Sequence, residues 1–135
     1  MPHVIVRYDP SLNNIETHLH NIALMLPREV VKALSCQNEG GSFTEDDVEV
    51  EFSPFGNSDK TNGFSMTFQV DANDYPSRRI NLTERNDRLA QAIHRQNERL
   101  GWFTGRGYVW TRLLPAAFTT LQAQCTSKNS KVDQK

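Results

Sequence analysis

Alternation of apolar and polar residues predicts four β-strands. Val4, Val6 and Tyr8 fall on one face of a segment from His3 to Tyr8. The same period of two recurs at residues 48–52, 64–70 and 108–113. This period, with many β-branched and aromatic residues, is typical of strands that bury one face.

A second pattern, with apolar residues at steps of three and four, predicts a helix after the first strand. The stripe consists of Leu12, Ile15, Leu19, Ile22 and Leu26, and it is typical of an amphipathic helix. Val30, Val31 and Leu34 extend it beyond Pro27. Because proline inside a helix costs about 3 kcal/mol, we expect a kink at Pro27 or a second short helix that begins there.

A weaker stripe predicts another helix between the third and fourth strands. It consists of Leu82, Leu89, Ile93, Gln96 and Leu100. Asn81 and Glu84 have the spacing of a capping box at its start, and Gly101 is a plausible stop. Residues 38–42 and 53–63 are predicted loops, and residues 71–77 are expected to end the third strand.

The order of elements is therefore strand, helix, strand, given twice. Each βαβ half predicts a parallel pair of strands joined by a helical crossover. We expect an α/β fold with a four-stranded sheet and both helices on one face. This domain covers residues 1–121, and the polar residues 122–135 are expected to form a disordered tail.

Charge and composition exclude several classes of partner. The 135-residue chain has a formal net charge of -1, whereas binding to a phosphate backbone needs a cationic surface. Residues 102–110 mix aromatic residues with a glycine-flanked arginine, a combination that can stack on bases. The near-neutral charge favours a role in the core or at a subunit interface instead. We expect no nucleic-acid partner.

No apolar run approaches the roughly 20 residues that span a membrane. The first residues also lack the basic region and cleavage site of a secretory signal. These features predict a cytoplasmic protein without a membrane partner.

Neither the histidines nor the cysteines have the spacing of a metal site. His18 and His20 are two residues apart, which on a helix points them about 200° apart. Cys36 and Cys125 are far apart, as expected of reduced thiols in the cytoplasm. We expect no metal and no other cofactor.

The second residue is the strongest chemical candidate. Removal of Met1 leaves Pro2 as a free secondary amine. An α-amino group has a pKa near 8, and apolar surroundings or nearby arginines lower it by disfavouring the cation. A neutral amine at pH 7 is a competent general base, and Val4 and Val6 would hold it on a rigid strand.

The opening residues also carry a resemblance to a known family. Met1-Pro2-His3-Val4-Ile5-Val6 resembles the start of 5-carboxymethyl-2-hydroxymuconate isomerases, members of the 4-oxalocrotonate tautomerase superfamily. Residues 64–70 resemble the strand that precedes the family's second helix. Arg78-Arg79 follow an apparent insertion containing Asp71 to Pro76, where the family has a glycine-arginine turn. The resemblance is spread over about residues 2 to 114.

The resemblance implies a cofactor-independent tautomerase or isomerase. Pro2 would be the acid/base that moves a proton within an unsaturated 2-keto or 2-hydroxy carboxylate. Arg79 is the first choice to hold the substrate carboxylate, and Arg78 is the adjacent alternative, because the planar guanidinium fork binds carboxylate at two points. Larger members of the family usually assemble as trimers, so we expect a homotrimer.

Two departures from the family pattern refine this expectation. The turn has Tyr75-Pro76-Ser77 before Arg78 and no glycine, so the carboxylate contact stays open. Residues 113–117 carry no acid where dehalogenase members have a water-activating glutamate, which favours isomerisation over hydration or dehalogenation. The alternative from another class is a non-catalytic binding or assembly protein that has kept the proline without the activity.

Overall fold

The computed structural model describes residues 2–36, 43–115, 119 and 121–123. The predicted loop at residues 38–42 and residues 124–135 of the predicted tail lie outside this part of the chain. Along the sequence the elements are β1 (His3–Tyr8), α1 (Ile15–Leu34), the 3-10 helix η1 (Glu45–Asp47), β2 (Glu49–Pro54), β3 (Phe64–Asn73), α2 (Pro76–Ile80), α3 (Leu82–Leu100) and β4 (Arg106–Leu114).

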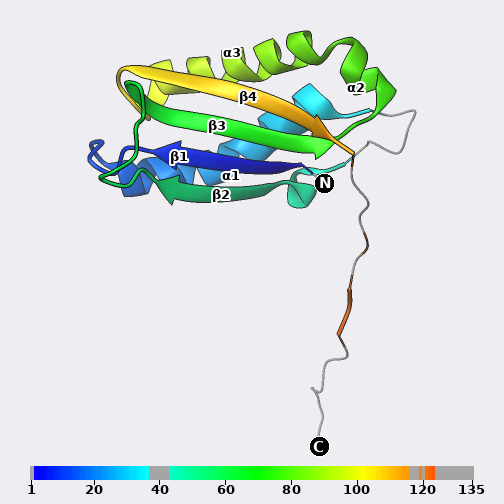
Figure 1. The fold of residues 1–135 in the computed structure, drawn as a ribbon, viewed down its shortest axis with the longest axis horizontal. Coiled ribbons are helices and arrows are strands. Elements are labelled where there is room, and N and C mark those ends of the chain that lie inside the picture. Colours follow the sequence, from blue (N-terminus) through cyan, green and yellow to red (C-terminus); the bar gives the residue numbers. More distant parts are fainter. Residues whose placement is uncertain (1, 37–42, 116–118, 120, 124–135) are drawn as a thin grey trace, which may run out of the picture.

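The four strands form one mixed sheet with the order β2-β1-β3-β4. β1 pairs with β2 in parallel, β3 pairs with β4 in parallel, and the central pair β1–β3 is antiparallel. Each parallel pair is joined by a helical crossover, as the connection of parallel strands requires. Figure 1 shows α1 and α3 on the same face of the sheet. The predicted α/β fold is therefore confirmed.

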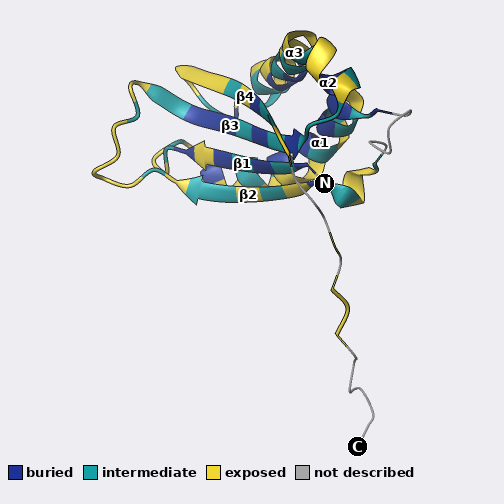
Figure 2. Ribbon diagram, turned by 45° about the vertical axis from the view of Figure 1, so that its right-hand side comes forward, coloured by how far each residue is buried: buried dark blue, intermediate teal, exposed yellow. Residues whose placement is uncertain are grey.

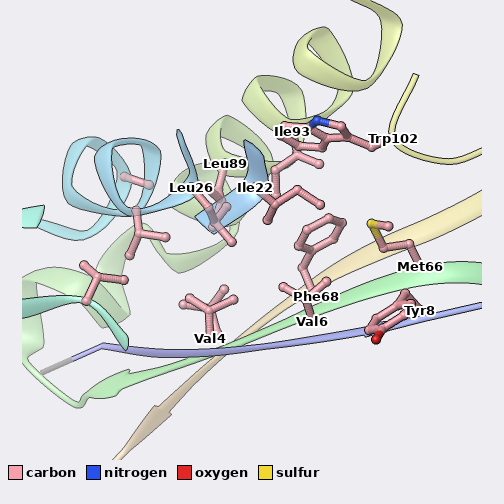
Figure 3. Close-up of a cluster of buried hydrophobic side chains, with 14 of the residues drawn as sticks. Val4, Val6, Tyr8, Ile22, Leu26, Met66, Phe68, Leu89, Ile93 and Trp102 are labelled. Atoms are coloured by element: carbon pink, nitrogen blue, oxygen red, sulfur yellow. The ribbon is translucent and has the colours of Figure 1, made fainter. Parts of the chain in front are cut away.

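The core lies between that face and the two long helices. Val4 and Val6 of β1 are fully buried, and Phe68 of β3 lies beside Val6 in the register. Ile22 of α1 and Ile93 of α3 pack above them (Figure 3). The alternation in the sequence thus marks the strand face that is covered, since successive side chains of a strand point to opposite faces.

α1 differs from its expected form in two respects. It begins at Ile15, three residues later than the apolar stripe, because the backbone first turns at Asp9, whose carboxylate accepts hydrogen bonds from the backbone and side chain of Ser11. It also continues through Pro27 as one helix, so the second short helix that was the alternative to a kink does not begin there. Leu26 and Val30 are buried on either side of the proline, and their burial outweighs the missing backbone bond.

The connection from β3 to α3 also differs from expectation. β3 continues to Asn73, and the five-residue helix α2 follows before α3 begins at Leu82. The capping box predicted at Asn81 is wrong, because no side-chain hydrogen bond caps the helix. Oδ1 of Asn81 instead accepts a hydrogen bond from Nε of Arg85 at 2.7 Å.

No helix within the described residues is long and apolar enough to cross a membrane.

Candidate active site

Pro2 lies buried at the start of β1. Its side chain is less than 2% exposed, and it continues the buried series of Val4 and Val6 by one step. A proline fits the first position of a strand because its missing N–H is not needed by the ladder. Its carbonyl accepts a hydrogen bond from the backbone of Glu49 at 3.2 Å. Burial of the ring and the hydrogen bond to the backbone carbonyl together fix the position of Pro2.

The strand register identifies the neighbours of Pro2. His3 pairs with Asp71 on β3 and with Glu49 on β2. Continued by one residue, the two ladders set Pro2 beside Ala72 and Val48, and both of these residues are buried. Pro2 thus has an apolar neighbour on each side, Ala72 at the end of β3 and Val48 just before β2.

Arg78 lies at the same end of the sheet and is 2% exposed. Its Nε donates to the carbonyl of Leu34, the last residue of α1, at 2.8 Å. Its Nη1 donates to the carbonyl of Asn73, the last residue of β3, at 3.0 Å. Asn73 follows Ala72, so this guanidinium ties together the two elements that border the start of β1.

Aromatic rings and burial complete the surroundings of Arg78. Its Cζ lies 4.9 Å from the ring centroid of Tyr75 and 5.7 Å from that of Phe43. Burial lowers the pKa of the Arg78 guanidinium, and the nearby charge of Arg85 acts in the same direction, whereas Cys36 and Tyr75 raise this pKa. The chain therefore holds a cation in a largely apolar site at the Pro2 end of the sheet.

Arg79 has a different environment. Its side chain is 59% exposed, and its Nε donates to Oδ1 of Asp74 at 2.7 Å. Neighbouring helical residues are rotated by about 100°, so within α2 one arginine turns inward and the next turns to solvent. The two arginines that the sequence proposed together are thus separated by the short helix that carries them.

The polar groups on the opposite face of the sheet form pairs of their own. His3 Nε2 lies 3.1 Å from Oε1 of Glu51. Arg112 binds Asp71 at two points, with Nε–Oδ1 at 2.8 Å and Nη2–Oδ2 at 2.9 Å. These hydrogen bonds, more than the accompanying charge attraction, lower the pKa of Asp71. His3 therefore faces an acidic neighbour on the other side of the sheet from the Pro2 ring.

The sequence did not indicate that Arg78 would be buried. A five-residue helix is too short to show a periodic pattern, and Arg78 has no apolar partner at helical spacing. The aromatic residue Tyr75, three positions before it, was the signal that could have favoured Arg78 over Arg79. Among the described residues, no cluster of three or more histidine, cysteine or acidic side chains could hold a metal ion.

Several solved structures have the same arrangement of strands and helices. MIF2 of Leishmania major is 16% identical, with 88% of this chain and 93% of that chain aligned and a TM-score of 0.54. A 5-carboxymethyl-2-hydroxymuconate delta-isomerase is 11% identical over 93% of this chain and 89% of its own, with a TM-score of 0.54. The chain has a tautomerase-type fold.

A protein of unknown function from Vibrio cholerae O1 biovar eltor shares this tautomerase-type fold, at 15% identity over 91% of this chain and 85% of its own, with a TM-score of 0.55. No family model matches the sequence, and no curated protein matches it. At these identities the likeness concerns the fold alone. Within the tautomerase-type fold, Pro2 stands immediately before the first strand, which begins at His3.

Proposed function

We propose that the protein is a cofactor-independent tautomerase or isomerase that uses the amine of Pro2 as its acid/base. The observation that carries the proposal is the burial of the Pro2 ring at the start of β1 within a tautomerase-type fold. A ring held by the sheet on both sides leaves its nitrogen with one fixed direction, which general acid–base catalysis requires. Removal of Met1 is the step that frees this nitrogen.

The proposed chemistry is a proton transfer within an unsaturated 2-keto or 2-hydroxy carboxylate. The neutral amine of Pro2 accepts the proton of the enol hydroxyl while the carbonyl forms. The resulting ammonium then donates a proton to the carbon of the former enol double bond that does not carry the oxygen. No net proton is gained or lost, so the cycle needs no cofactor. The apolar neighbours Val48 and Ala72 favour the neutral amine at the start of each cycle.

Arg78 is the better supported anchor for the substrate carboxylate. Its charge lies in a buried site bordered by the end of β3, where charge attraction is stronger than in water. Arg79 is exposed, and Asp74 already offsets its charge. We therefore assign the main anchoring role to Arg78 and a secondary role at the rim to Arg79.

A homotrimer forms part of this proposal. The face of the sheet away from the helices carries Tyr108, Trp110 and Leu114 of β4 among the exposed large hydrophobic residues. Burying such residues against further copies of the chain is favourable by about 25 cal/mol per Å² of apolar surface. Figure 2 shows β4 mostly exposed along this edge of the sheet.

The second candidate is a non-catalytic binding or assembly protein with the same fold. It is favoured by Arg78, whose Nε and Nη1 donate to the backbone carbonyls of Leu34 and Asn73 instead of facing open space. In this case Pro2 and Arg78 stabilise the end of the sheet and neither one contacts a substrate.

Mass and activity together separate these candidates. The intact mass of the native protein shows whether Met1 is removed, and retention of Met1 would exclude catalysis by the Pro2 amine. The activity assay follows the enol-to-keto conversion of phenylenolpyruvate and of simple 2-hydroxydienoates. Pro2→Ala keeps a terminal amine but makes it primary and frees it from the ring, so we expect a loss of about 100-fold in kcat/KM. Undiminished activity of Pro2→Ala would contradict the mechanism, and inactivity of the unmodified protein on every substrate would favour the binding protein.

A further inference from the structure

A cavity of about 330 Å³ lies between the start of α1 and the end of α3. This volume falls within the range of small-molecule sites. Its wall includes Leu12, Asn14 and His18 around the start of α1, and Leu100, Gly101 and Trp102 at the end of α3.

The cavity lies at the far end of β1 from Pro2. β1 runs from His3 to Tyr8, and α1 follows it in the chain. At about 3.3 Å per residue, the length of β1 separates the cavity from Pro2 by roughly 20 Å. The cavity also lies on the side of the helices, whereas the opposite face of the sheet is the one proposed to meet further copies of the chain (Figure 1). A ligand bound here is therefore separate from the substrate of the proposed function.

Trp102 brings a hydrogen-bond donor without a partner to this cavity. The residue lines the cavity, is 1% exposed and packs in the same core as Ile93. Its Nε1 is buried and has no hydrogen-bond partner among the described residues. Figure 3 shows this nitrogen on the edge of the ring that points away from the sheet. Because a buried donor without an acceptor costs free energy, a ligand atom that accepts from this N–H is stabilised.

The start of α1 provides further donors. The first N–H groups of a helix lack partners inside the helix, and the side chain of the N-cap residue Asn14 makes no capping hydrogen bond. The helix dipole adds a partial positive charge at this end. Glu16, the acidic residue of the first turn, is two positions before His18 and so points about 200° away from it. The carboxylate of a ligand is therefore favoured at the start of α1.

The end of α3 provides the opposite charge at the same cavity. Gly101, with a φ of 67°, ends the helix and donates its N–H to the carbonyl of Asn97 at 2.7 Å. The other carbonyls of the last turn lack partners inside the helix, and the dipole gives this end a partial negative charge. Oδ1 of Asn97 accepts a hydrogen bond from the backbone of Phe103 at 2.8 Å, which holds the following segment in place. Opposite partial charges thus meet at one cavity.

We propose that this cavity binds a small zwitterionic α-amino acid with an aliphatic side chain. Its carboxylate accepts from the start of α1 and from Nε1 of Trp102, and its ammonium group donates to carbonyls at the end of α3. Leu12, Leu100 and Phe103 line the cavity and offer contacts to the aliphatic side chain. Among the described residues, no lysine, arginine, aspartate or glutamate lines the cavity. A ligand without net charge therefore suits it better than an anion or a cation.

Titration of the full-length protein with L-leucine tests this proposal, with calorimetry for the affinity and ¹H–¹⁵N spectra for the location. The chain has two tryptophans, and Trp110→Phe assigns the indole signal of each. We expect leucine to move the Trp102 indole signal downfield, as a new hydrogen bond does. The signal of Trp110, which lies on the opposite face of the sheet, should stay in place and serves as the internal control.

Two analogues of leucine each remove one of its charges. 4-Methylpentanoate lacks the ammonium group, and 3-methylbutylamine lacks the carboxylate. Each should bind about fivefold more weakly than leucine, which corresponds to the loss of one charge at a helix end.

Asn14→Asp tests the placement of the carboxylate. The new charge competes with the ligand for the N–H groups of α1, and aspartate is a favourable N-cap residue, so the fold is retained. Leucine and 4-methylpentanoate should bind about fivefold more weakly to this variant, and 3-methylbutylamine should bind no more weakly. Asn62→Asp is the matched control, because both asparagines have a φ of 55° and Asn62 does not line the cavity.

The proposal is overturned if leucine binds no more tightly than either analogue or does not bind at millimolar concentration. It is also overturned if the Trp102 indole signal is unchanged at saturation, or if Asn14→Asp and Asn62→Asp weaken binding equally. Binding is measured without turnover. A failure here therefore leaves the role of Pro2 untouched, and an inactive Pro2 leaves this cavity untouched.

Discussion

Arg78 and Arg79 are neighbours in the chain but have opposite physical environments. Arg78 donates to two backbone carbonyls from a buried position, while Arg79 meets Asp74 at the surface. The sequence proposed both and placed Arg79 first, because the insertion before them left their positions ambiguous by a few residues. The direction in which each points depends on α2, which the sequence pattern does not predict.

Replacing each arginine by methionine should separate their contributions to stability. Arg78→Met leaves the carbonyls of Leu34 and Asn73 without their donor, so we expect a loss of about 2–4 kcal/mol in the free energy of unfolding. Arg79→Met removes an exposed ion pair and should change this free energy by less than about 0.5 kcal/mol. Urea unfolding measures both. Equal effects would show that Arg78 does not join α1 to β3.

The second prediction concerns Asp71 and the dependence of stability on pH. Its pKa is lowered in the folded protein by the hydrogen bonds from Arg112, so the pair stabilises the fold above the ordinary carboxyl pKa of about 4. That stabilisation is lost as the pH falls through the lowered pKa. Asp71→Asn should therefore lower the melting temperature most at neutral pH, and the difference from the unmodified protein should shrink in acid.

Asp87→Asn is the control for this comparison, because Asp87 is an exposed residue of α3. Its difference from the unmodified protein should stay small across the same pH range. A difference at Asp71 that is constant with pH would contradict the assignment of the pair.

At the scale of the elements, periodic segments were predictable and short irregular ones were not. The four strands and two long helices follow from burial of one face, which leaves a period of two or 3.6 in the sequence. Glu45–Asp47 and Pro76–Ile80 form helices too short to show either period. β3 continues to Asn73 because β4 pairs with it as far as Leu114, and such a partner is invisible in a local pattern.

The structure at Pro27 is another feature that the local sequence does not determine. Helix propensity alone predicts a kink or a new helix at this residue, and α1 runs from Ile15 to Leu34 without a new helix beginning at Pro27. The burial of Leu26, Val30 and Leu34 depends on contacts with the sheet and with α3. Tertiary packing therefore decides the outcome at Pro27, as it often does for weak local preferences.

Gly107 on β4 carries the third prediction. Gly107→Ala places a Cβ against the Met66 carbonyl and the Phe103 ring, so we expect a loss of about 1–3 kcal/mol in unfolding free energy. Gly56→Ala is the matched control, because its Cβ would lie 3.7 Å from the nearest atom, an ordinary contact. Thermal or urea unfolding of both variants checks this. A harmless Gly107→Ala would show that β4 and Phe103 do not approach so closely.

At the scale of the whole molecule, the two faces of the sheet differ in their surroundings. One face is covered by α1 and α3, and the end at Pro2 holds the buried guanidinium of Arg78. The other face of the sheet carries Trp110, which is 52% exposed and lies 5.4 Å from the Cζ of Arg112. This arrangement leaves one face of the sheet for contact with further copies of the chain.

Self-association through that face is the fourth prediction. Trp110→Glu places a charge in the proposed interface and should convert a trimer to a monomer, with the molar mass measured by light scattering after size exclusion. Leu24→Glu is the control, because Leu24 is 64% exposed on α1, away from that face of the sheet. An unmodified protein that is monomeric at micromolar concentration, or a trimer that survives Trp110→Glu, would contradict the proposed assembly.

The central claim is that the amine of Pro2 moves the proton, and a blocked amine tests it most directly. One additional residue that is retained before Pro2 turns the amine into an amide and leaves every residue of the fold unchanged. Its enol-to-keto rate on phenylenolpyruvate is compared with that of protein whose mass shows a free Pro2, at equal melting temperature. We predict a loss of about 100-fold or more in the blocked protein. Equal rates in the two proteins would contradict the role of Pro2.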